Sequence, residues 1–133
     1  MARDFPLGRV NVHKAASPAS SDLWGPHLWN FKACTSATAN NGMIPYGTTI
    51  NSVSVTAYIG NFKPSGNAAS FATVTNLLID PGYTPVVVDD VYVAVKFQWP
   101  GDDYKGEKAT LVFFLILSNS ATHPFYWQYV HIE

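Results

Sequence analysis

The stretch Ala109-Thr110-Leu111-Val112-Phe113-Phe114-Leu115-Ile116-Leu117 ends in seven consecutive large apolar residues and carries no charge. Successive side chains of a β-strand point to opposite faces, so a run without polar alternation needs cover on both faces. Seven residues are far too few to span a bilayer as a helix, and the β-branched and aromatic content favours a strand. We therefore expect residues 109–117 to form the central strand of an all-β domain, and the cover of its second face becomes the main functional question.

Two other segments show the alternation of a half-buried strand. From Ser52 to Ile59 and from Val91 to Trp99, apolar side chains fall on one face and mainly polar side chains on the other. The second segment is followed by the polar loop 100–108, so we expect it to pair with residues 109–117 as a hairpin.

Three further segments are predicted as strands. Residues 71–79 carry β-branched and aromatic side chains and end at the turn Asp80-Pro81-Gly82. Residues 85–88 begin with a proline, which cannot donate to a strand ladder, so they belong at a sheet edge. Residues 124–132 are aromatic on both faces and need cover on both sides. Residues 36–49, which contain the tight-turn signal Asn41-Gly42, are predicted to be a loop.

The number and spacing of these segments indicate the fold class. Seven to eight short strands, with turn signals every eight to twelve residues, predict a single-domain antiparallel β-sandwich with little helix. The one-sided alternation suits sheets with one face in solvent, which favours a jelly-roll or immunoglobulin-like sandwich over a closed barrel. A length of 133 residues is typical of one domain.

Residues 1–35 differ in character from the β-sandwich domain predicted for residues 36–133. Residues 15–22 are small, polar and interrupted by Pro18, as in a linker, and residues 23–31 hold two Trp and a Phe beside a Gly-Pro turn. One interpretation is an extended N-terminal arm that includes the first strand; the other is an ordinary first strand after a loose terminus. In either case we expect Trp24, Trp29 and Phe31, from the same chain or from a neighbouring one, to cover the second face of residues 109–117.

Composition and charge narrow the possible partners. Charged residues make up only 13% of the chain, against a usual fraction of about 25%, so the surface must consist largely of Ser, Thr, Asn and Gly. The net charge is -1 and there is no Lys/Arg cluster, so neither nucleic acid nor a membrane is an expected partner. The single Cys34 cannot form an intrachain disulfide, and the N-terminus has no apolar signal segment. We expect a protein made in the cytoplasm without a signal peptide.

The sequence contains no pattern that indicates catalysis. There is no nucleophile elbow and no glycine-rich nucleotide loop, and the four His form no closely spaced ligand pair. We therefore predict that the chain is not an enzyme and that it has no catalytic residues, no cofactor and no metal ligands. Calcium binding stays open at two acidic pairs, Asp89-Asp90 and Asp102-Asp103, if their loops meet.

The apolar surplus and the low charge favour a non-enzymatic structural subunit. Such a subunit buries β surface and an N-terminal arm against copies of itself, for example as a trimer, and against a larger assembly. In character the chain is similar to small virion proteins such as capsid decoration or tail components, which makes the virion its expected place of action. The alternative is a lectin-like module in which exposed Trp and Tyr rings stack on a glycan. The residues expected at the interface or binding surface are Phe5, Trp24, Trp29, Phe31, Phe114, Trp127 and Tyr129.

Overall fold

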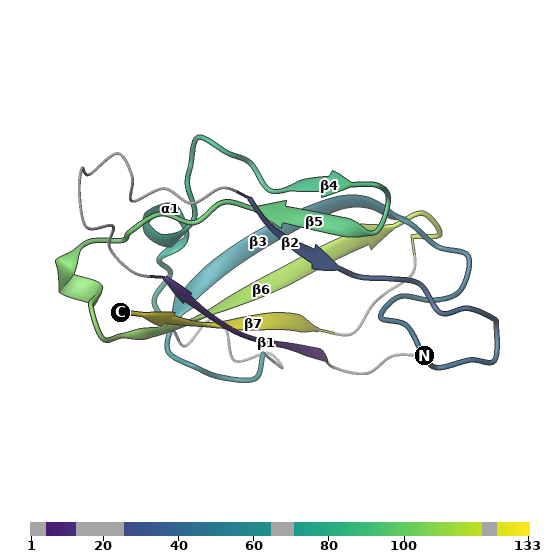
Figure 1. Cartoon of the computed structure of the whole chain (residues 1–133), viewed down its shortest axis with the longest axis horizontal. Helices are drawn as coiled ribbons and strands as arrows, with labels where there is room; N and C mark the ends of the chain where they lie inside the picture. Colours follow the sequence, from purple (N-terminus) through teal and green to yellow (C-terminus); the bar gives the residue numbers. More distant parts are fainter. Residues whose placement is uncertain (1–4, 13–25, 65–70, 121–124) are drawn as a thin grey trace.

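The computed structural model of the chain describes residues 5–12, 26–64, 71–120 and 125–133, with side chains from Leu7 onward. Within these residues seven strands form two facing sheets (Figure 1). A single turn of α-helix and a 3-10 turn lie between strands. The elements are β1 (Phe5–Val12), β2 (His27–Asn30), β3 (Ile50–Ile59), α1 (Thr75–Leu78), β4 (Val86–Val88), β5 (Tyr92–Val95), η3 (Asp102–Tyr104), β6 (Lys108–Leu117) and β7 (Tyr126–Ile132).

The large sheet has the strand order β1-β7-β6-β3, and the small sheet has the order β2-β5-β4. β6 lies between β7 and β3 and is antiparallel to both, which confirms the predicted central strand. The predicted mostly β fold with two sheets and minimal helix is also confirmed. One pair departs from the antiparallel expectation, because β1 runs parallel to β7.

The predicted hairpin between residues 91–99 and 109–117 is wrong. β5 lies in the small sheet, between β2 and β4. Beyond β5 the chain pairs with the segment that follows α1: the amide of Gln98 donates to the Leu78 carbonyl at 2.9 Å, and the Asp80 amide donates to the Lys96 carbonyl at 2.8 Å. Alternation shows which face of a strand is buried but not which strand lies beside it, so the pattern left the neighbour of β5 undetermined.

The strand predicted for residues 71–79 is wrong as well, because its centre is the helical turn α1. The turn buries Leu78 and leaves Leu77 exposed. Gln98 stabilises it, since its Nε2 donates to the carbonyls of Asn76 at 3.0 Å and Leu77 at 3.1 Å. Carbonyls at a helix end need such partners, and a distant glutamine cannot be read from the local sequence.

The free edge of β3 is covered at both ends by its own chain. The Ile59 amide donates to Ala72 and the Val74 amide donates to Ala57, both at 2.8 Å, so residues 72–74 run beside β3. At the other end the Ile50 amide donates to the carbonyl of Asp90, in the turn between β4 and β5. β4 is an edge strand of the small sheet, as predicted from Pro85.

The predicted loop over residues 36–49 is confirmed apart from an isolated bridge at Ile44. Its Gly42 passes so close to the backbone at Ala33 that an added Cβ would lie 2.4 Å from the Ala33 carbonyl carbon. The loop is also tied to the large sheet, because the Tyr126 hydroxyl donates to the Met43 carbonyl. Burial and the nearby Cys34 raise the pKa of the Tyr126 phenol, which keeps the hydroxyl protonated as a donor.

Candidate interaction surface

The outer face of the large sheet carries three exposed apolar side chains. Phe114 is 65% exposed, Ile116 46% and Phe125 44%. β6 alternates inward and outward, so Phe114 and Ile116 share the face turned away from the small sheet. The pairing of Phe113 with Tyr126 places Phe125 beside Phe114, one step further along the two strands. We refer to Phe114, Ile116 and Phe125 as the outer apolar patch.

The neighbours of the patch on β3 are small and polar. Ser54 is the cross-strand partner of Phe114, and Ser52 is the partner of Ile116. Both serines are exposed. Their short side chains leave the faces of the larger apolar groups open, so the patch has a polar, uncharged border along β3.

The other half of the outer face is covered by the chain itself. After β3 the loop crosses the sheet at Thr110, whose hydroxyl donates to the Gly60 carbonyl at 2.7 Å and accepts from the Phe62 amide at 3.3 Å. The Phe62 ring meets Tyr58 edge-on at 5.9 Å and stacks on Phe71 at 4.0 Å. Thr110 is consequently fully buried on an outer-facing position.

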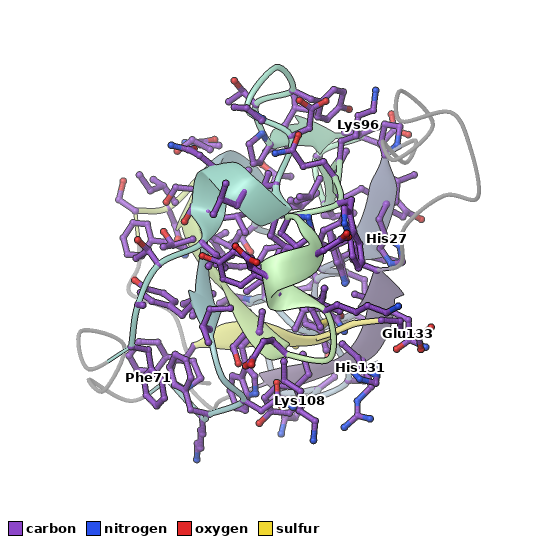
Figure 2. All side chains as sticks on the ribbon, turned by 90° about the vertical axis from the view of Figure 1, so that its left-hand side faces the viewer. His27, Phe71, Lys96, Lys108, His131 and Glu133 are labelled. Atoms are coloured by element: carbon purple, nitrogen blue, oxygen red, sulfur yellow. The ribbon has the colours of Figure 1, made fainter. Side chains whose placement is uncertain are left out.

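Beyond this cover the outer face ends in polar groups. Lys108 and His131 are cross-strand partners, and His131 lies 3.8 Å from the Glu133 carboxylate. Figure 2 looks onto this end of the sandwich, with Lys108, His131 and Glu133 near one another and Phe71 on the opposite side. The outer face therefore changes along β6 from charged, to covered, to exposed and apolar.

Trp127 lies on the outer face next to the patch, as the partner of Val112. It is only 4% exposed, yet it is not part of the core between the sheets. Its indole Nε1 is buried and has no hydrogen-bond partner among the described residues. A buried donor without a partner costs about 1–3 kcal/mol.

No known protein family, curated protein or solved structure matches this chain. In the described part of the chain, no helix has the length and apolar character needed to cross a membrane. Function must therefore be inferred from the geometry of the surface alone.

Trp29 and Phe31 lie on the inner face of β6, which corrects the expectation that they cover its second face. The ring of Trp29 is 4.9 Å from that of Phe113, and the ring of Phe31 is 5.6 Å from Phe113 and 5.1 Å from Tyr126. The sequence showed that these rings need burial, but it did not show on which side of β6 they lie.

A hydrogen bond inside the core joins the two sheets. The indole Nε1 of Trp29, on β2, donates to Oε1 of Gln128, on β7, at 2.8 Å. Gln128 in turn donates from Nε2 to the Tyr129 carbonyl at 3.0 Å. Sequence reasoning missed this pair, because Gln128 lies among aromatic residues and only its 2% exposure distinguishes it from a surface glutamine.

The structure separates the predicted interface residues into three groups. Trp29, Phe31 and Trp127 are buried in their own chain, whereas Tyr129 is partly exposed and Phe114 mostly exposed. The side chain of Phe5 and the whole of Trp24 lie outside the described residues. Their predicted roles in an interface stay predictions. Ile116 and Phe125, which join Phe114 in the patch, were not singled out from the sequence.

The described residues contain no cluster of side chains typical of a metal site. No three His, Cys, Asp or Glu side chains within them gather into a metal site, so Asp89-Asp90 and Asp102-Asp103 stand apart as turn residues. A cavity of about 170 Å³ lies between α1 and the segment before β4. Its carboxylate, Asp80, already accepts the Gly82 amide at 2.8 Å.

Proposed function

We propose that this chain is a non-enzymatic assembly subunit that buries the outer apolar patch against other copies of itself. The observation that carries the proposal is the exposure of Phe114, Ile116 and Phe125 together on one face of the central strand pair. Scattered exposed apolar residues are ordinary, whereas a contiguous group on a regular sheet is typical of an interaction surface. The larger assembly that we propose is of the virion type, such as a capsid decoration or a tail.

The free energy available from burying the patch of one copy is too small to hold two copies together by itself. Complete burial of a side chain of these types contributes about 1.5–3 kcal/mol. Covering the exposed parts of these three side chains therefore contributes about 2–5 kcal/mol per copy. Association costs about 4–15 kcal/mol in lost freedom, so the patch must meet its counterpart on the partner or be joined by other contacts.

The border of the patch also supports this use. Charged residues are depleted at the centres of protein interfaces, and the exposed neighbours of the patch on β3 are serines. The charged groups Lys108 and Glu133 lie at the far end of the same face. A copy docked on the patch leaves those charges in solvent.

The alternative of a carbohydrate-binding module has less support. A sugar ring stacks on an exposed aromatic face, but Trp29 and Trp127 are almost fully buried. Trp99 is partly buried and its indole already donates to Asp102 at 3.1 Å.

The proposal is tested by the native mass of the purified protein, measured by light scattering over micromolar concentrations. We expect an oligomer for the unchanged chain and a shift toward the monomer for Phe114→Ser. Leu28→Ser is the matched control, because Leu28 is a strand residue with similar exposure, 53%, on the outer face of the small sheet. A monomeric unchanged chain, or equal shifts in both variants, contradicts the proposal.

A further inference from the structure

In the described part of the chain β1 pairs with one strand only, although Val12 lies in the core and Leu7 and Val10 pack against it. β1 lies at the edge of the large sheet, and its strand pairing is with β7 alone (Figure 1). The ladder is parallel and shifts register between Pro6 and Arg9, where Gly8 adopts a φ of 97°. The last link is the Glu133 amide, which donates to the Val12 carbonyl at 2.8 Å. β1 can therefore leave the sheet as a unit without separating any other pair of strands.

β7, in contrast, needs a strand in this place. Tyr126, Trp127, Gln128, Val130 and Ile132 are all buried, so both of its faces are occupied. Without β1, this seven-residue strand becomes an unprotected sheet edge, which proteins avoid because such an edge recruits other chains. The fold requires that a β1 strand cover β7, but nothing in the pairing requires that it come from the same chain.

The connection from β1 to the rest of the fold is long. Residues 13–26 link Val12 to His27, which begins β2 in the other sheet. Fourteen residues reach up to ~50 Å when extended, whereas a domain of this size has a radius of gyration of about 14 Å. The length is sufficient for β1 to lie on an adjacent copy while β2 stays in its own domain.

We propose that β1 is exchanged between copies, so that the strand on β7 of each subunit comes from a neighbour. This inference rests on the proposed function, because the patch must first hold the copies together. In the closed form β1 pairs with β7 of its own chain, and in the exchanged form it pairs with β7 of a neighbour. Both forms make the same β1–β7 contacts, so these contacts do not favour either form. In an isolated chain the tether gives β1 an effective concentration on the order of millimolar at its own β7. Copies held at the patch present β1 at a comparable local concentration to a neighbour.

The consequence of exchange is slow dissociation. Separating two exchanged copies requires β1 to detach from β7 along its whole length, whereas separating two closed copies requires only that the patches part. The patch then determines whether copies associate, and β1 determines how long they stay together.

A pair of cysteines across β1 and β7 distinguishes the two forms. Asn11 and His131 are Cα partners, and neither is buried. The test variant carries Asn11→Cys and His131→Cys in a Cys34→Ser background. Equal amounts of isotope-labelled and unlabelled chains are mixed, refolded together and then oxidised. The same bond forms in both forms, but it lies within one chain when closed and between two chains when exchanged. Thr56→Cys with Val112→Cys, a pair across β3 and β6, is the control that stays within one chain.

Exchange predicts covalent species of two or more chains on denaturing gels without reductant. It also predicts that about half of the 11–131 linked peptides join a labelled to an unlabelled segment. An oligomer whose 11–131 bonds all lie within single chains overturns the exchange and leaves the assembly proposal standing. A monomer with internal bonds overturns both. If residues 11 and 131 do not bond at all, the register of β1 on β7 is wrong and the exchange falls with it.

Discussion

The two faces of β6 differ although their side chains are adjacent in sequence. Phe113 is 2% exposed and Phe114 is 65% exposed. The inner face is covered along its length by segments far away in the chain, including β2 and Phe31 beyond it. On the outer face, the described residues cover Thr110 and the neighbouring Trp127 but leave Phe114 exposed. An apolar run thus identifies a strand that needs cover, while the distant parts of the chain determine how much of that cover is internal.

Truncating each phenylalanine in turn should give the largest difference between the two faces. We expect Phe113→Ala to lower the free energy of unfolding by about 3–5 kcal/mol, because it leaves a cavity beside the rings of Trp29 and Phe31. Phe114→Ala should cost less than about 1 kcal/mol in the monomer, because most of its ring is already in solvent. Urea denaturation, at protein concentrations too low for copies to associate, measures both losses of unfolding free energy. Equal losses would contradict the burial of Phe113 and the exposure of Phe114.

A smaller effect is expected at the hydrogen bond that joins the two sheets on the inner face. Gln128→Leu removes the acceptor for the Trp29 indole and leaves a buried donor, which should cost about 1–3 kcal/mol. Adding Trp29→Phe removes the donor too and should cost less than the sum of the single changes. A double-mutant cycle by urea denaturation gives this coupling. If the losses of unfolding free energy from the two single changes simply add, the hydrogen bond between Trp29 and Gln128 does not contribute to stability.

The weakest effect should be the contribution of His27 to the pH dependence of folding stability. His27 lies 4.5 Å from the Trp29 ring and 6.4 Å from Phe97, and desolvation there lowers its pKa below the usual 6.5. The unfolded chain then takes up the proton first as the pH falls. Stability due to His27 is therefore present above about pH 6.5 and is lost as the pH falls toward the lowered folded pKa.

His27 is exposed to solvent, so the slope should be shallow. Unfolding free energies at about pH 7.5 and about pH 5.5 should differ less in His27→Gln than in the unchanged chain. A steeper dependence in His27→Gln would mean that His27 stabilises the fold in its protonated form instead.

The sequence predicted the positions of strands better than it predicted which segments lie beside them. The alternation over residues 52–59 and the unbroken run from Leu111 identified β3 and β6, because period-two burial is a local property. The partner of β5 and the helical turn α1 were missed, because both depend on residues 78–80 and Gln98 meeting in space. Of the outer apolar patch, only Phe114 was predicted. Ile116 was read as buried within the run, and the exposure of Phe125 follows from the register of β7 on β6.

The edges of the large sheet limit how copies of this chain can be added to one another. On one side, residues 72–74 already occupy part of the β3 edge. On the other, β1 includes Pro6, which has no amide hydrogen, and breaks its ladder at Gly8. An interrupted, twisted edge is a poor template for another straight strand. Stacking of sheets edge to edge into a fibre is therefore opposed at both margins of the large sheet.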